Sequence, residues 1–529
     1  MMRGYRYLKE HGQLARVPEL NRALTNTPLS IQRNVTAKII FGAGLPQVEL
    51  IVRQFLLTRI AGVALNRALL LSLGQPGSRV VHPLPPEWRR VLTAHGFVLA
   101  PVLSALTWQG WIALYFFAGV VRFLKGLLDT VAGSKAPNYR ELGRYAYFDT
   151  LSEIALPKPC RDGRSHDIIT WYARSSLRPQ ALDSLCHGVK GAADRAVDGL
   201  SVRSIPSVIP PLIGGRALGR YLWWGLRAVT LAAFDVFRGR WWHAALLGEA
   251  SYAAAVRAND GVALASVYLF HNSGWIFRPL WTYEAEKCGA RVDFYFYSTN
   301  CEPFKRPTGY PDIGYGWEAM NWPRYLVWGP GQAEFVRRAV GPEANVTIVG
   351  PIWFNTSAIE LPPLPSNSVA VFDVQPVRDS YYRTLVPQES FHVPAVANRF
   401  LQDIHATVVA CGGVMVFKRK RNIGSRAHPG YRHYVRSMDA LTNLVIIDPE
   451  TAAPRLIESC AVTISMPFTS TALIARDAGK PSCYYDSSGI VQADDRAAHG
   501  IPIIHGRAEL ESWLRQQFAM SAPVVRSAE

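Results

Sequence analysis

The segment from Val462 to Asp486 constrains the fold more than any other part of the chain, because its local signals follow the order strand, turn, helix, strand. It opens with β-branched residues that end a short apolar run. Ser465 to Ser470 predicts a tight turn, and the residues from Thr471 predict a helix that ends at Gly479. A second strand is expected from Ser482. This alternation indicates a parallel sheet of the α/β class.

The turn in this segment has the chemistry of a phosphate site. A helix that begins beside the carboxyl end of a parallel strand presents unpaired N–H groups and the positive end of its dipole. The hydroxyls of Ser465, Thr469, Ser470 and Thr471 could complete the cradle, so these four are the predicted phosphate-binding residues. An ordinary capped helix in an α/β domain explains the same pattern equally well.

The composition narrows the class of protein. The 529 residues are enough for two or three domains with complete cores, and the 49% hydrophobic content excludes a disordered chain. The formal net charge of +17 predicts an anionic partner, which could be nucleic acid, a phospholipid surface or a phosphorylated substrate. Seven scattered cysteines without CxxC spacing argue against a zinc site and a disulfide framework, and favour the cytoplasm. We expect no signal peptide.

Residues 1–150 are predicted to form a mainly helical, membrane-associated region. The stretch from Gly96 to Val121 has no charged residue and is long enough to span a bilayer. However, Trp108 and Trp111 lie in its middle, whereas a spanning helix carries tryptophan at its ends. A helical hairpin lying in the membrane interface therefore fits better than a span, and a buried helical core is the alternative.

A second apolar and basic stretch, Gly214 to Leu247, lies in a predicted helical insertion at about 205–250. Its arginines alternate with tryptophans at helical spacing, as in surfaces that bind one leaflet of an anionic membrane. The same residues could stack on single-stranded RNA, but no RNP, helix-turn-helix or zinc-finger pattern is present. We therefore expect anionic inner-leaflet lipid as a partner, no nucleic acid, and a peripheral location on the inner face of the cell membrane.

Alternating strands and helices predict two Rossmann-like domains, at residues 151–358 and 369–510, followed by a C-terminal tail at 511–529. The proline-rich break between the domains runs from Ile359 to Ser368. The predicted strands are His166–Tyr172, Val262–Phe270, Val292–Tyr297, Tyr325–Gly329 and Val346–Val349 in the first domain, and Val369–Val374, Val414–Phe417 and Leu444–Ile447 ahead of Val462 in the second.

Polar residues at the carboxyl ends of these strands form the predicted working edge of each sheet. In the first domain His271 and Asn272 follow one strand and Asn300 follows the next, and we expect the two asparagines on the acceptor side. In the second domain Lys418 and Arg419 follow a strand, so both could point to a donor phosphate. A solvated basic loop is the alternative for the second pair.

Two Rossmann-like domains that face a cleft and are joined by a proline-rich linker describe the GT-B architecture of glycosyltransferases. Several motifs also resemble those of bacterial surface carbohydrate (polysaccharide) biosynthesis proteins, which are similar in turn to retaining Kdo transferases and, more distantly, to GT-B sialyltransferases. These motifs are Lys418–Arg421, His428–Pro429, Asp448, Ser465–Thr471, Gly479–Pro481 and Tyr484–Asp486. The resemblance covers residues 260–505.

The resemblance implies a glycosyltransferase that takes a sugar from a nucleotide-activated donor, with CMP-Kdo favoured. The acceptor would be a lipid-linked glycan or a surface polysaccharide, such as lipopolysaccharide or capsule. In the sialyltransferase-like enzymes a His-Pro pair contacts the nucleotide phosphate, and the match here assigns that contact to His428. Such enzymes do not in general need a metal, because basic residues and helix ends neutralise the leaving phosphate, and no cofactor is implied.

Transfer of an activated sugar requires a carboxylate or a histidine near the anomeric carbon. His271 could deprotonate an acceptor hydroxyl, although a structural histidine is the alternative. Glu284 lies on the helix predicted after the His271 loop, and Asp373 flanks the first loop of the second domain, where it could meet the donor sugar. These three residues are the predicted catalytic groups.

Other functions fit the same residues. The scaffold could carry a polyol-phosphate transferase of the CDP-glycerol type or a nucleotide-sugar epimerase, although an epimerase would not need membrane-binding segments. A non-catalytic membrane scaffold that organises polysaccharide assembly is a further alternative.

Overall fold

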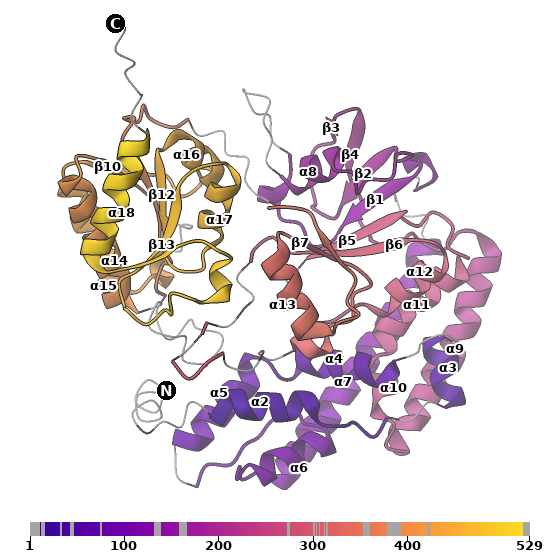
Figure 1. Cartoon of the computed structure of the whole chain (residues 1–529). Helices are drawn as coiled ribbons and strands as arrows, with labels where there is room; N and C mark the ends of the chain where they lie inside the picture. Colours follow the sequence, from indigo (N-terminus) through magenta and orange to yellow (C-terminus); the bar gives the residue numbers. More distant parts are fainter. Residues whose placement is uncertain are drawn as a thin grey trace, which may run out of the picture.

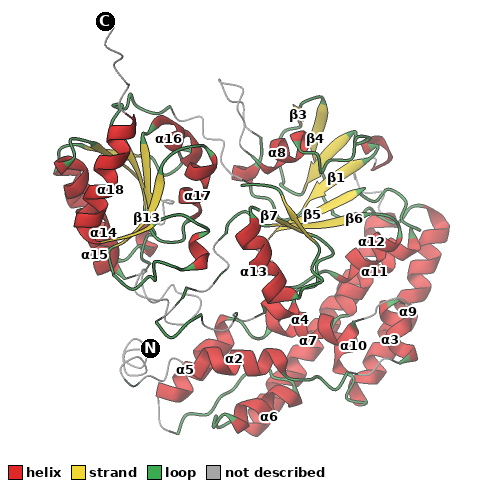
Figure 2. Cartoon of the chain, in the orientation of Figure 1, coloured by secondary structure: helices red, strands yellow, loops and turns green. Residues whose placement is uncertain are grey.

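Two α/β units lie side by side, and a group of N-terminal helices packs against the first of them (Figures 1 and 2). The computed structural model describes residue 11 and residues 16–521, except 32–33, 43–46, 75–76, 132–138, 158–166, 272–275, 300–301, 303, 306, 311–312, 314–315, 353–359, 378–392 and 420–423. The predicted acceptor-side residues Asn272 and Asn300 lie outside the described residues.

The N-terminal helices share one hydrophobic core with the first sheet. They are α2 (Arg16–Asn26), α3 (Val35–Phe41), α4 (Val48–Arg59), α5 (Val63–Gly74), α6 (Pro86–Ala94) and α7 (Pro101–Val131). Ile51 and Phe55 of α4 are buried in the same cluster as Tyr268 and Phe294 of the sheet. These helices therefore continue the first domain, because their buried residues and those of the sheet form one core.

The first sheet is parallel except at one edge, where β3 pairs antiparallel with β4. Its strands are β1 (Tyr145–Phe148), β2 (Ser184–His187), β3 (Arg195–Val197), β4 (Leu200–Ser204), β5 (Val267–His271), β6 (Arg291–Tyr295), β7 (Tyr325–Val327) and β8 (Val346–Ile348), in the order β3-β4-β2-β1-β5-β6-β7-β8. The helices of this domain are α8 (Ile168–Arg174), α9 (Gly214–Phe237), α10 (Trp241–Ala245), α11 (Leu247–Ala258), α12 (Leu280–Lys287) and α13 (Pro330–Val340).

The strand predicted at His166–Tyr172 is wrong. Helix α8 forms there, because the Asp167 carboxylate caps it by accepting the N–H of Thr170 at 2.8 Å. A central strand of the sheet is instead β1, which lies in the part of the chain expected to be helical. Its four residues, YAYF, are all buried, so the strand shows no polar–apolar alternation that sequence reasoning could detect.

The second sheet is parallel throughout, with the order β11-β10-β9-β12-β13-β14. Its strands are β9 (Ser368–Phe372), β10 (Val414–Lys418), β11 (Leu444–Ile447), β12 (Val462–Ser465), β13 (Ser482–Asp486) and β14 (Ile503–His505). Its helices are α14 (Pro394–Ala410), α15 (Pro429–Ser437), α16 (Ala453–Ser459), α17 (Ser470–Asp477) and α18 (Gly506–Ser521). The strand, turn, helix and strand predicted between Val462 and Asp486 are confirmed as β12, α17 and β13.

Both sheets have the strand order of a doubly wound Rossmann fold. Numbered along the chain, the second sheet reads 3-2-1-4-5-6, and the first sheet reads the same with one further strand once the edge strand β3 is set aside. The order reverses between β1 and β5 in the first sheet and between β9 and β12 in the second. Two such domains in one chain confirm the predicted GT-B fold class. In sheets of this kind ligands bind outside the carboxyl ends of the strands at the reversal point.

The segment that follows β6 joins the two domains. The Phe304 ring stacks on Phe468 of the second domain, with ring centroids 4.4 Å apart. Glu302 accepts from Arg496 at 2.7 Å, and the backbone N–H of Lys305 donates to Asp495 at 2.8 Å. Because Phe468 lies between β12 and α17, these contacts bring the segment after β6 against that turn of the second domain.

Glycines allow α7 to pack closely against its neighbours. A Cβ at Gly225 of α9 would overlap the Phe123 ring of α7, and a Cβ at Gly119 of α7 would lie 2.8 Å from Cβ of Leu247 in α11. Any other residue type would force the Phe123 ring or the backbone at Leu247–Gly248 to move. The helices α7, α9 and α11 therefore form one closely packed layer.

Candidate active site

The reversal point of the second sheet gathers most of the predicted donor-binding residues. Lys418 of β10 and Ser465 of β12 both pair in register with Phe372, the last residue of β9. Asp373 follows Phe372 directly. Three neighbouring strands thus end at one level, although their last residues, Phe372, Lys418 and Ser465, lie 46 or more positions apart in the chain.

Asp373 is a buried carboxylic acid whose pKa is raised. Tyr431 of α15 donates its hydroxyl to one carboxylate oxygen, and the other oxygen, Oδ1, has no hydrogen-bond partner among the described residues. Burial raises the pKa of Asp373 to about 6, although Tyr431, Arg419 and Lys418 oppose this shift. A buried acid that titrates near neutrality and keeps one oxygen unpaired is typical of a functional site.

Two cations flank this acid. Lys418 is 5% exposed, and its ammonium donates to the Arg419 carbonyl at 3.2 Å. Burial lowers the pKa of Lys418, while the carboxylates of Glu450, Asp373 and Asp448 oppose the shift. The Nε atom of Arg419 is buried and has no hydrogen-bond partner within the described ranges. The N–H groups of these two cations are donors of the kind that bind a phosphate.

His428 lies beside the loop that follows β9. Its backbone N–H donates to the Pro376 carbonyl at 2.8 Å, which brings the His-Pro pair close to the Asp373 loop. The His428 side chain caps α15, because Nδ1 accepts the N–H of Gly430 at 3.1 Å. The fold therefore places His428 at this site, with one ring nitrogen already committed to the helix cap.

The turn between β12 and α17 clusters its hydroxyls. The Oγ atoms of Ser465 and Thr471 lie 2.8 Å apart, and Thr469 donates to the Met466 carbonyl at 2.8 Å. Thr469 is the N-cap residue, yet its side chain makes no capping hydrogen bond. Helix α17, which begins at Ser470, therefore receives no hydrogen bond from its N-cap side chain to its first N–H groups.

The reversal point of the first sheet places a histidine beside an acid. His271 ends β5, and Asp149 follows β1, the neighbouring strand. The ring Nε2 of His271 lies 3.3 Å from the Thr150 carbonyl, while Thr150 donates to Asp149. Burial lowers the pKa of His271 and raises the pKa of Asp149, and the two groups attract each other electrostatically. A neutral imidazole beside a carboxylate can act as a general base.

Backbone strain occurs at both reversal points. Thr150 has φ of 54° and Phe468 has φ of 62°, in the left-handed region that side chains other than glycine rarely adopt. Such conformations cost roughly 1–3 kcal/mol each and persist where the surroundings impose them, commonly at functional sites.

Glu284 is not brought to either edge. Its carboxylate lies on α12 and pairs with Arg257 of α11 at 3.2 Å and with Lys287 at 2.9 Å. The site is buried between helices, where the two cations satisfy the acid. The structure therefore assigns Glu284 a role in packing, and we leave it out of the catalytic groups.

The family of the chain follows from a match that covers more than half of its residues. Residues 224–514 match the family described as polysaccharide biosynthesis PFTS motif protein, and this span is more than half of the chain. The letters P, F, T and S stand here as Pro467, Phe468, Thr469 and Ser470. The chain belongs to this family. We call Pro467–Ser470 the PFTS turn, and it lies at the reversal point of the second sheet.

Among curated proteins, none matches the chain significantly. Solved structures with similar folds include sucrose-phosphate synthase from Thermosynechococcus elongatus, with 8% identity over 72% of this chain and 90% of that chain and a TM-score of 0.36. UDP-GlcNAc 2-epimerase from Methanocaldococcus jannaschii has 7% identity over 72% and 93%, with a TM-score of 0.35. The wall teichoic acid polymerase TagF has 10% identity over 77% and 90%, with a TM-score of 0.38. At these TM-scores and identities, no functional conclusion follows from the likenesses.

Sequence reasoning missed two residues of the site in this member of the PFTS family. Asp149 was missed because β1 was not recognised; an acid directly after a buried aromatic run was the available signal. Tyr431 was missed because it meets Asp373 from 58 positions away in the chain, and no local pattern reports such a contact.

Proposed function

We propose that the protein is a glycosyltransferase of polysaccharide biosynthesis that binds the phosphate of a nucleotide-activated sugar at the reversal point of the second sheet. The observation that carries this proposal is the alignment of Lys418, Asp373 and Ser465 at three neighbouring strand ends, beside the PFTS turn. Buried cations and helix N–H groups stabilise the negative charge that develops on a leaving phosphate. In this proposal Oδ1 of Asp373 accepts a hydrogen bond from a hydroxyl of the donor sugar.

The acceptor is activated in the first domain. Burial lowers the pKa of His271 and so favours the neutral ring, which can act as a base. The ring takes the proton of an acceptor hydroxyl as the hydroxyl oxygen attacks the anomeric carbon and the bond to the leaving phosphate breaks. Asp149 stabilises the imidazolium that forms, because its carboxylate attracts the positive ring.

CMP-Kdo is the donor that we propose first, on the strength of the resemblance alone, and a lipid-linked or surface polysaccharide is the acceptor. The test is a panel of CMP-, UDP-, GDP- and CDP-activated donors, read by thermal stabilisation and by donor hydrolysis. One donor class is expected to stabilise the native protein, since a ligand that binds only the folded state raises its stability. The double variant Thr471→Ala, Lys418→Ala should lose both responses, and the exposed variant His433→Ala should keep them.

Other results of the panel would overturn the proposal. Transfer of a polyol phosphate from CDP-glycerol would identify a polyol-phosphate transferase, and conversion of a UDP-sugar without release of UDP would identify an epimerase. Stabilisation by a donor without any turnover, or no response to any donor, would support the non-catalytic scaffold.

We also propose that α7 and α9 hold the protein on an anionic membrane. Residues Pro101–Thr130 of α7 are long and apolar enough to cross a bilayer, and only 17% of the most apolar window is buried. Leu114 and Phe117 of α7 are 65% and 63% exposed, and Trp223 of α9 is 63% exposed. The Arg227 guanidinium lies 5.5 Å from the centre of the Trp223 ring, as at a membrane interface where cations accompany aromatic side chains.

If α7 and α9 bind the membrane, a variant of α7 should lose most of its lipid binding. Leu114→Glu with Phe117→Glu is expected to lower binding to vesicles of phosphatidylcholine and phosphatidylglycerol at least about tenfold, because each apolar side chain contributes about 1.5–3 kcal/mol when buried. The measurement is flotation with vesicles at low and high salt. The matched control replaces exposed apolar residues of the second domain, Val393→Glu with Met520→Glu, and should bind normally. Equal flotation of both double variants would contradict the assignment.

A further inference from the structure

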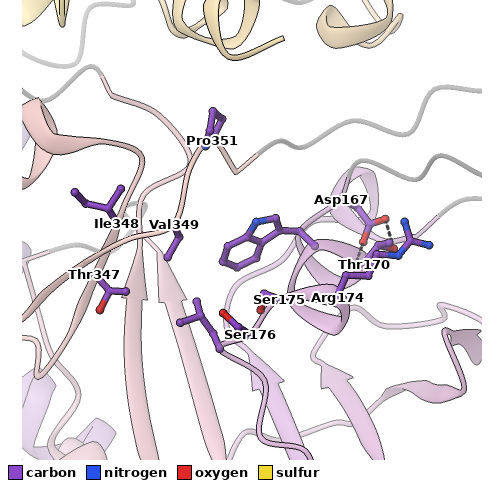
Figure 3. A pocket seen from close by; sticks show the side chains of 11 residues that line it. Asp167, Thr170, Arg174, Ser175, Ser176, Thr347, Ile348, Val349 and Pro351 are labelled. Carbon is purple, nitrogen blue, oxygen red and sulfur yellow. Dashed lines mark hydrogen bonds between the residues drawn. The ribbon is translucent and has the colours of Figure 1, made fainter. Parts of the chain in front are cut away.

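A pocket on the first domain is lined by none of the residues described at the two reversal points. It occupies about 580 Å³ between α8 and the strand β8, within the range of roughly 300–1,000 Å³ that ligand pockets span. Figure 3 shows Thr347, Val349 and Pro351 on one wall, and Ser175, Ser176 and Arg174 on the facing wall. Strand β8 is the edge strand of its sheet in the described part of the chain.

The lining combines an aromatic ring with hydroxyls. Trp171 of α8 lines the pocket and is half-buried, so part of its indole is available to a ligand. Ser176 and Thr347 add hydroxyl groups from the two walls. The apolar C–H face of a pyranose ring packs on an indole, while its hydroxyl groups need hydrogen-bond partners at the rim. An indole face with hydroxyl groups around it is therefore the lining expected of a site that binds a sugar.

The charges at the pocket disfavour an anionic ligand. Arg174 is already bound by Asp198, with Nε to Oδ2 at 2.7 Å and a second hydrogen bond at 3.3 Å. Asp167, which also lines the pocket, is a carboxylate that caps α8. A phosphate or an acidic sugar would therefore meet a neutralised cation and a negative charge, both of which disfavour its binding. A neutral sugar carries no charge, so it would not be repelled.

We propose that this pocket is a subsite for neutral sugar residues of the acceptor glycan, stacked on Trp171. This subsite rests on the proposed transferase function and would extend it. A glycan held in the first domain would present its growing end to the reacting groups elsewhere in that domain. The subsite would hold the glycan between successive additions of sugar residues, without taking part in the transfer reaction.

The test measures glycan binding separately from catalysis. Calorimetric titration uses maltohexaose, cellohexaose and a hexamer of β-1,4-linked N-acetylglucosamine as probes. At least one is expected to bind the native protein, and Trp171→Ala should weaken that binding at least about tenfold, by loss of a stacked aromatic contact. Trp171→Tyr should retain most of the affinity, and Trp513→Ala, which removes a half-buried tryptophan of α18 in the second domain, should change nothing.

Two further measurements keep the test decisive. Thr347→Arg fills the pocket from the opposite wall without altering the indole, and should also abolish glycan binding. Donor hydrolysis should be unchanged in every one of these variants, so a protein that binds glycan but processes no donor would refute the transferase and leave the subsite standing. Native protein that binds none of the three hexamers, or equal binding by Trp171→Ala, would overturn the subsite.

Discussion

Replacement of His271 by alanine is expected to lower sugar transfer by about 10²–10⁴-fold, the usual contribution of a general base. Donor binding should survive, because His271 lies in the first domain and the proposed phosphate site lies in the second. The measurement is steady-state transfer with the donor that the panel selects, together with thermal stabilisation by the same donor. His433→Ala, an exposed histidine of α15, is the control.

The pH dependence gives this prediction a second readout. Burial lowers the pKa of His271, so its ring stays neutral to a lower pH than an ordinary histidine and the acid limb of the rate profile should fall below about pH 6.5. Asp149→Asn removes the negative charge that favours the imidazolium, and should move that limb lower still while slowing transfer. His271→Ala with more than a tenth of native activity would exclude the histidine as the base.

Replacement of Asp373 by asparagine is expected to raise the stability of the free protein above pH 6 and to reduce transfer at the same time. The carboxyl titrates at about 6 in the folded protein and near 3.8 when unfolded, so the folded state binds more protons between these values. Stability of the native protein should therefore fall as pH rises from about 4 to about 6. A difference of about two pKa units corresponds to about 3 kcal/mol.

The measurement for Asp373 is the melting temperature from pH 4 to pH 8. Native protein should lose stability across the lower half of this range, whereas Asp373→Asn, which keeps an oxygen for the Tyr431 hydroxyl, should show a flatter profile. The control is Asp439→Asn, an exposed acid in the same domain. Parallel profiles for native protein and Asp373→Asn would show that the buried carboxyl does not titrate as described.

Local signals identified the second domain better than the first. The segment from Val462 to Asp486 could be read correctly because β-branched residues, a hydroxyl-rich turn and a helix-ending glycine each act on their immediate neighbours. Strand β1 could not be predicted, because its four buried aromatic and small residues show no polar–apolar alternation. The apolar run after Asp167 was predicted as a strand, but the Asp167 cap makes it helix α8.

Side-chain roles depended on which element covers each residue. His271 and Glu284 were predicted with the same reasoning, since both lie in or just after one strand–helix connection. His271 ends its strand at the reversal point, whereas Glu284 turns toward Arg257 on α11, a helix that reaches it only in the folded state. The direction of a helical side chain is set by its position around the helix, but the neighbour that it meets is set by tertiary packing.

The sequence by itself determined that this chain forms parallel α/β domains, that a hydroxyl-rich turn precedes α17, and that basic residues follow β10, because each of these depends on residues close together in the chain. Only the tertiary structure decided that Lys418, Asp373 and Ser465 end neighbouring strands at one level, and that Asp149 stands beside His271. The physical reason is that strand order is chosen by the burial of whole sheet faces under helices, and this choice joins residues that no local pattern connects.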